Sequence, residues 1–142
     1  LFLQALGDVT ADDALRQDPK SFRAHYLMGL VQHHGEGNLP KAIYHLQTAE
    51  KLFIEKFGER PEKEGPDVLV YSRTLLQLVY AHGEMDHHEE KIRYVDAPSD
   101  RLGNNDAVPL KARPLLKLKR SAEAREIAEQ AAGSDATPSR DA

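Results

Sequence analysis

The fold of this chain is decided by residues 38–57, which read NLPKAIYHLQTAEKLFIEKF. Apolar residues recur in this stretch at intervals of one, three and four, and this spacing keeps them on one stripe of a helix. Asn38 is typical of an N-cap, Pro40 suits a first helical turn, and Gly58 is typical of a helix end. We therefore predict one amphipathic helix, with an apolar stripe formed by Leu39, Ala42, Ile43, Leu46, Ala49, Leu52, Phe53 and Phe57.

A second helix is predicted just before this one. Residues 22–34 carry apolar side chains at helical spacing, and Gly35-Glu-Gly37-Asn38 follows them as a turn. Two helices joined by so short a connection run antiparallel, so residues 22–57 predict an αα-hairpin.

Another helix pair is predicted after a polar loop. Residues 57–66 contain two Pro and two Gly and predict the loop. Residues 68–81 start with side chains that favour a strand, but the apolar run is too long for one and predicts a helix ending at Gly83. The returning helix is predicted over 84–102, with Met85, Ile92 and Val95 facing inward.

The last third of the chain predicts a less regular pair. Residues 121–132 are strong helix formers with an alanine-rich stripe. Pro109 and Pro114 interrupt the preceding segment, so its helix is predicted to be broken, to be short, or to start after Pro114. We expect residues 133–142, rich in Ser, Asp, Thr and Pro, to be a disordered tail. No strand is predicted, and the fold class is all-α.

Composition excludes several classes of function. The 142 residues include no Cys, which excludes disulfides and thiolate metal sites. The net charge of −4 gives no basic surface for nucleic acid, and no apolar run approaches the roughly 20 residues of a membrane span. Without a signal sequence or transmembrane segment, we expect a cytoplasmic protein. The start at Leu1-Phe2-Leu3, without an initiator Met, leads us to expect a processed chain or a fragment.

The first helix pair carries the pattern of a helical repeat. Asp18-Pro19 precedes the pair, a small residue lies near the middle of its first helix, and alanines flank a large apolar residue in its second. This pattern resembles the tetratricopeptide repeat (TPR), whose small side chains let neighbouring helices approach closely. The matching residues are Gly29 in the first helix and Ala42, Leu46 and Ala49 in the second.

The resemblance continues along the chain with one departure. In the third pair, Ala112 matches the small residue of the first helix, and the stripe of the second helix matches the repeat. In the middle pair, Leu76 replaces the small residue and only Ala97 of the alanines remains, which is more similar to the longer repeats of kinesin light chains. The alternative is an irregular helical bundle with alanine at close contacts; the stripe of the third pair is Ala124, Ile127, Ala128 and Ala131.

The resemblance implies an α-solenoid, in which hairpins stack as a right-handed superhelix. Each hairpin in such a stack contacts only its neighbours, and the first helices of the pairs line a concave face. The implied organisation is the end of a preceding repeat or an N-terminal helix at 1–19, then three pairs over 20–132 (20–57, 66–102 and 106–132), then the tail at 133–142.

The register of the repeat predicts which residues line the concave face. Arginine side chains bind carboxylates through a forked pair of donors, and tyrosines add apolar area with a polar tip. The face therefore favours a non-enzymatic scaffold that binds a protein or an extended peptide carrying acidic side chains. Each residue, taken alone, is also consistent with an ordinary half-exposed helical position. The predicted residues are Arg23, Tyr26, Leu30, His33, Arg73, Gln77, Tyr80, Arg113 and Leu116.

Two alternatives from other classes stay open. The stack could be a regulatory sensor module of a larger signalling protein, or it could self-associate through uncapped ends such as Leu1-Phe2-Leu3. Neither a phosphate-binding glycine loop nor a nucleophile motif is present, so we predict no enzyme and no cofactor. We also predict no metal site. The candidates for one are His82, His87 and His88, but their spacing matches no metal-binding motif, and histidine near a helix C-terminus interacts favourably with the helix dipole.

Overall fold

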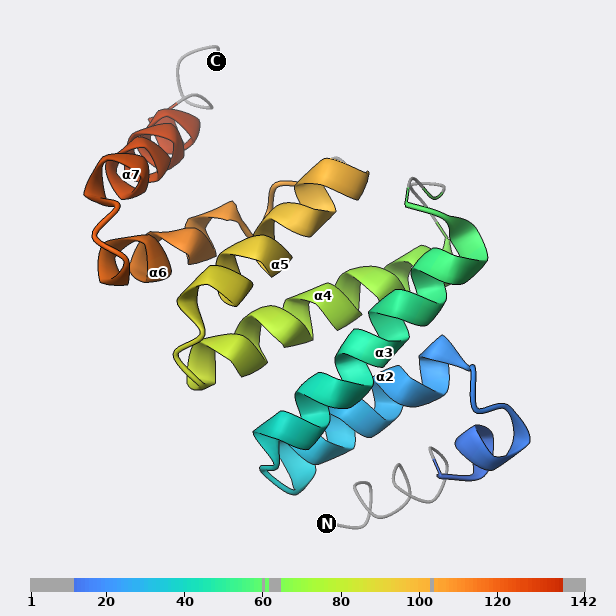
Figure 1. Ribbon diagram of the computed structural model, residues 1–142. Helices are drawn as coiled ribbons and strands as arrows, with labels where there is room; N and C mark the ends of the chain where they lie inside the picture. Colours follow the sequence, from blue (N-terminus) through green and yellow to red (C-terminus); the bar gives the residue numbers. More distant parts are fainter. Residues whose placement is uncertain (1–11, 60, 62–64, 103, 137–142) are drawn as a thin grey trace.

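In the computed structural model, the described residues 12–59, 61, 65–102 and 104–136 form helices and short connections, with no strand among them (Figure 1). Residues 12–17 are helical. None of the helices in these ranges is both long enough and apolar enough to cross a lipid bilayer. The further elements are α2 (Phe22–Leu30), a π-helical turn (Val31–Gly35), α3 (Leu39–Phe57), α4 (Pro66–Glu84), α5 (His88–Leu102), a 3₁₀ turn (Val108–Lys111), α6 (Ala112–Lys117) and α7 (Ser121–Ala136).

The helix predicted from residues 38–57 is confirmed as α3. The Asn38 side chain accepts a hydrogen bond of 3.2 Å from the backbone N–H of Lys41, as an N-cap does. Pro40 lies in the first turn, and Gly58 ends the helix with a φ of 82°. Local sequence therefore sets both ends of this helix.

The predicted stop of the next helix at Gly83 is wrong. α4 continues through Gly83 to Glu84, and α5 begins only at His88 rather than at residue 84. The chain reverses at Asp86, which adopts a left-handed φ of 56°. Aspartate tolerates this conformation better than most residues, so no glycine is needed at the turn. Met85 consequently lies in the connection, where it is half-buried against the core.

The third pair is short and irregular, as the prolines predict. Pro109 starts a 3₁₀ turn, and Pro114 lies in the first turn of α6, where its missing N–H costs little. The alternative that the helix starts after Pro114 is wrong. α7 extends to Ala136, so the predicted disordered tail is wrong for residues 133–136, and residues 137–142 lie outside the described part of the chain. Of the N-terminal helix or preceding repeat predicted over residues 1–19, residues 1–11 lie outside it as well.

The helices pack in chain order. Each long helix contacts the next one, from α2 and α3 through α4 and α5 to α6 and α7, and Figure 1 shows α2 and α7 at opposite ends of this row. Side-chain contacts also join alternate helices: Arg23 of α2 pairs with Asp67 of α4, and Glu50 of α3 pairs with Arg101 of α5. Most contacts therefore join helices that follow one another in the chain, and ion pairs join alternate helices.

The main core lies between α2, α3, α4 and α5. Phe53 is stacked on Tyr71, with ring centroids 4.2 Å apart, and contacts Phe22 edge-on at 5.5 Å. A smaller cluster, of Ile92, Leu115 and Ala124, joins α5 to α6 and α7. The predicted stripe of α7 is only partly buried, because Ala128 and Ala131 are exposed. The main core comprises Phe22, Ile43, Leu46, Ala49, Phe53, Val68, Tyr71, Leu75, Leu78, Val79, Ala81, Tyr94, Val95, Ala97 and Leu102.

Gly29 permits the close approach of α2 and α3. A Cβ atom at this position would lie 2.6 Å from Cγ and Cδ2 of the fully buried Leu46. Helix propensity favours alanine over glycine by about 1 kcal/mol, but overpacking a core costs about 1–3 kcal/mol. We expect Gly29→Ala to lower the free energy of unfolding by about 1 kcal/mol net, measured by urea denaturation.

Gly83 supplies a matched control for this substitution. It also lies inside a helix, but a Cβ atom there would meet only the flexible side chain of Lys91, at 3.3 Å. Gly83→Ala should therefore leave stability unchanged or raise it by up to about 1 kcal/mol. Equal effects of the two substitutions would contradict the close approach of α2 and α3.

Candidate functional site

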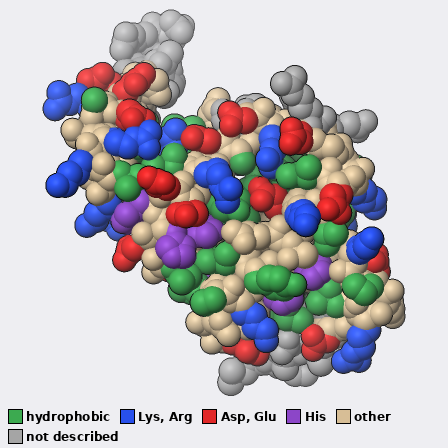
Figure 2. Space-filling model, viewed as in Figure 1, with side chains coloured by type: hydrophobic (Ala, Val, Ile, Leu, Met, Phe, Trp, Pro, Cys, Tyr) green, Lys and Arg blue, Asp and Glu red, His purple; other side chains and the backbone are tan. Residues whose placement is uncertain are grey.

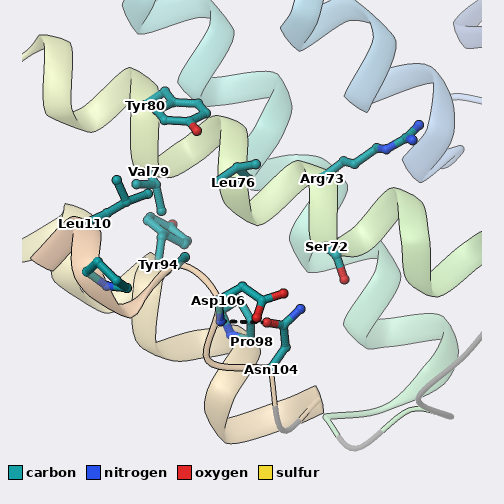
Figure 3. A pocket seen from close by; sticks show the side chains of 12 residues that line it. Ser72, Arg73, Leu76, Val79, Tyr80, Tyr94, Pro98, Asn104, Asp106 and Leu110 are labelled. Carbon is teal, nitrogen blue, oxygen red and sulfur yellow. Dashed lines mark hydrogen bonds between the residues drawn. The ribbon is translucent and has the colours of Figure 1, made fainter. Parts of the chain in front are cut away.

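A cavity of about 430 Å³ lies between α4, α5 and residues 104–110 (Figure 3). Most of its wall is apolar, and its polar side chains belong to Ser72, Arg73, Asn104 and Asp106. We name it the α4 cavity. Its remaining lining residues are Leu76, Val79, Tyr80, Tyr94, Pro98, Ala107, Pro109 and Leu110.

The segment 104–110 forms one wall of the α4 cavity because the third pair begins irregularly. The side chain of Asn104 accepts a hydrogen bond of 2.9 Å from the backbone N–H of Asp106, which holds a tight turn (Figure 3). The 3₁₀ turn then brings Leu110 toward Val79 and Tyr94. A regular helix over these residues would place different side chains against α4.

Tyr80 also lines a second cavity. This second cavity, of about 380 Å³, lies where α4 ends, α5 begins and α6 passes by. Its wall includes three cationic side chains, and we name it the basic hollow. Its lining residues are His33, His34, Tyr80, Gly83, Glu84, Asp86, His88, Lys91, Arg113, Pro114 and Lys117.

The residues predicted for the concave face divide between these two cavities and the contact of α2 with α4. Arg73 and Tyr80 line the α4 cavity, and Tyr80, His33 and Arg113 line the basic hollow. Leu116 is exposed and lines neither. The structure thus brings four of the nine predicted residues to two cavities that share Tyr80.

Three of the other predicted residues lie along the contact of α2 with α4. Arg23 is paired with Asp67, and Gln77 is bonded through its side-chain oxygen to Nε2 of His34, at 2.9 Å. Tyr26 is half-buried: burial raises the pKa of its phenol, and the nearby charge of Arg73 partly offsets this rise. These side chains hold the two helices together.

His33 and Leu30 complete the predicted set. His33 is buried, with Nε2 lying 3.2 Å from Oε2 of Glu84, and its ring is stacked on that of His34 at 4.2 Å. Leu30 is half-buried. His33 therefore contributes to the packing of α2 against α4 as well as to the wall of the basic hollow.

The histidines named as metal candidates form a pair instead. Nδ1 of the buried His82 lies 2.9 Å from Nδ1 of His87, a hydrogen bond that requires one neutral ring. Burial lowers the pKa of His82, and the neighbouring His87 lowers it further. His88 lies apart, on the wall of the basic hollow. Among the described residues, no three His, Asp or Glu side chains are grouped as metal ligands.

A similar pair joins α2 to α3. Nδ1 of His25 is 3.1 Å from Nδ1 of His45, and Nε2 of His25 is 2.9 Å from the carbonyl oxygen of Pro19. Figure 2 shows histidine side chains gathered at separate places on one face of the molecule. The histidines are thus distributed in contacts between helices.

Sequence reasoning missed most of the wall of the α4 cavity. Tyr94 comes from a second helix of a pair, and Asn104, Asp106 and Leu110 come from the irregular segment. The two prolines predicted that this segment is irregular, but they did not predict which helices it packs against. Lys91 and Lys117 of the basic hollow were missed for the same reason, since no sequence spacing joins α5 to α6.

The chain was compared with protein-family models, curated proteins and solved structures, and none of them matches it.

Proposed function

We propose that this chain is a non-enzymatic scaffold with a TPR-like stack, which binds an extended peptide along α4. Support for the stack comes from the packing of helices in chain order and from the close approach at Gly29. Repeats built in this way leave an extended surface between the first helices of their pairs.

The observation that carries the proposal is that two cavities lie along α4 and share Tyr80 as a lining residue. Together they follow one side of α4 from Ser72 to Glu84. The 19 residues of α4 span about 28 Å at about 1.5 Å per residue. An extended peptide rises by about 3.3 Å per residue, so about eight residues would fit along this helix.

The lining indicates the chemistry of the peptide. An apolar side chain of the peptide would enter the α4 cavity beside Leu76 and Tyr80, where it would be shielded from water. Arg73 forms no ion pair with another residue in the described part of the chain, so its guanidinium is available for an acidic side chain of the peptide. Tyr80 is 43% exposed, which leaves its ring accessible from both cavities.

A peptide selection tests this proposal. A phage-displayed library of random dodecapeptides is selected on the full chain, and the affinity of the enriched peptides is measured by fluorescence anisotropy. We expect peptides with an apolar residue near an acidic one. We also expect Tyr80→Ala and Arg73→Glu each to weaken binding at least about tenfold, since central aromatic and arginine contacts are typical hot spots.

Two substitutions elsewhere serve as matched controls. Tyr44 is 61% exposed on α3, and Arg125 is exposed on α7; neither lines the two cavities. Tyr44→Ala and Arg125→Glu should leave the affinity within about twofold, well under the hot-spot range. If no peptide is enriched, or if the controls weaken binding as much as Tyr80→Ala, the proposal is wrong.

A further inference from the structure

The basic hollow gathers cationic side chains from two helices. Lys91 comes from α5, and Arg113 and Lys117 come from α6, where a spacing of four residues puts them on the same face. Pro114 is buried at the wall between them. Cations from separate helices meet here because residues of α5 and α6 line the same cavity as the end of α4.

These three cations are not neutralised by ion pairs. Elsewhere Arg23, Arg101 and Lys111 each contact a carboxylate, at Asp67, Glu50 and Asp96 respectively. Lys91, Arg113 and Lys117, by contrast, form no ion pair with any residue in the described ranges. Their charge is therefore available to a ligand.

The acidic side chains of the basic hollow do not cancel this charge. Glu84 is already in contact with His33, and Asp86 is the other carboxylate on the wall. Three cations and two carboxylates leave a local excess of one positive charge, in a chain whose net charge is −4. An anion that displaces water here would gain from several charge-assisted hydrogen bonds.

We propose that the basic hollow binds a phosphate monoester dianion, which a phosphorylated residue of the peptide presents from the Tyr80 side. Three oxygens of a phosphate accept bonds from donors in different directions, whereas a carboxylate offers two oxygens in one plane. Arg113 provides a planar fork, and Lys91 and Lys117 provide ammonium groups around it. This inference rests on the proposed function for the source of the phosphate, but the chemistry of the site is testable without a peptide.

Binding is measured on the ¹⁵N-labelled full chain by two-dimensional NMR at pH 7.5 and constant ionic strength. The small probes are inorganic phosphate, phosphoserine and acetate. A second experiment uses a peptide enriched from the phage-displayed library, with and without one phosphoserine. We expect phosphate and phosphoserine to shift the amide signals of residues 83–91, 113 and 115–117 and to bind at least about tenfold more tightly than acetate. The phosphorylated peptide should bind at least about tenfold more tightly than its unmodified form.

Substitutions on the wall of the basic hollow distinguish binding at this site from nonspecific attraction of anions. Arg113→Gln and Lys117→Gln should each weaken phosphate binding about fivefold or more. Asp86→Asn removes a nearby negative charge, and asparagine tolerates the left-handed conformation, so it should strengthen binding about threefold. Arg125→Gln, on exposed α7, should have no effect.

Several outcomes would overturn the inference: acetate binding as tightly as phosphate, equal losses from Arg113→Gln and Arg125→Gln, or signal shifts spread over the whole chain. Phosphate binding without any selected peptide would leave this site standing and contradict the proposed function. Peptides that depend on Tyr80 but gain nothing from phosphorylation would contradict only the phosphate site.

Discussion

Phe53→Ala is expected to lower the free energy of unfolding by about 3–5 kcal/mol. The side chain is 1% exposed and lies where α2, α3 and α4 meet. It stacks on Tyr71 with an angle of 6° between the ring planes and contacts Phe22 edge-on. Truncation removes these contacts and leaves a cavity that three helices cannot close without moving. Urea denaturation followed by circular dichroism measures the loss.

Phe57, one helical turn further along α3, is the matched control. It is 37% exposed and contacts Phe22 at a centroid distance of 6.0 Å. Because water already reaches much of its ring, Phe57→Ala should cost about 1 kcal/mol or less. A similar cost at both positions would show that α3 does not bury the face that the structure assigns to it.

Arg101→Met should lower the free energy of unfolding by about 2–3 kcal/mol. The guanidinium of Arg101 donates to Oε2 of Glu50 at 3.3 Å and to the hydroxyl of Tyr71, so it joins α3, α4 and α5. The side chains of Arg101 and Glu50 are only 27% and 17% exposed. Burial raises the pKa of Glu50, and the charge of Arg101 opposes this rise. Removing the arginine leaves a largely buried carboxylate without this partner; the cost is below the roughly 3–5 kcal/mol of a fully buried pair because water reaches both groups.

A double-mutant cycle tests this explanation. Glu50→Gln in the Arg101→Met background removes the uncompensated charge, so it should restore at least half of the lost stability. The exposed pair of Arg120 and Glu123 is the control, and Arg120→Met should change stability little because solvent screens that pair. If Glu50→Gln brings no recovery, the cost of Arg101→Met comes from lost packing and not from the buried charge.

Local sequence predicted the features that depend on only a few neighbouring residues. Asn38 and Gly58 set the ends of α3 because a cap acts on the adjacent turn. The prolines at 109 and 114 predicted a short, irregular third pair because proline removes a backbone donor wherever it lies. The end of α4 was mispredicted because glycine is allowed inside a helix as well as after one, and the left-handed residue at this turn is Asp86.

The candidate site depends more on tertiary structure than the helix ends do. The periodicity of α4 identified Arg73 and Tyr80, since it shows which residues share a face of one helix. It could not identify Tyr94, Asn104 or Lys91, because these residues reach the site through the placement of other elements.

The sequence by itself determined that the described residues form an all-helical fold, and it determined the course of α3 and which residues share a face of α4. Only the tertiary structure decided that Tyr80 lies between an apolar cavity and a basic one. The physical reason is range: helix spacing and capping act over about one turn, whereas a cavity is set by how far apart neighbouring helices are held. At the α4 cavity, one wall is the irregular segment 104–110, whose position against α4 and α5 no local pattern specifies.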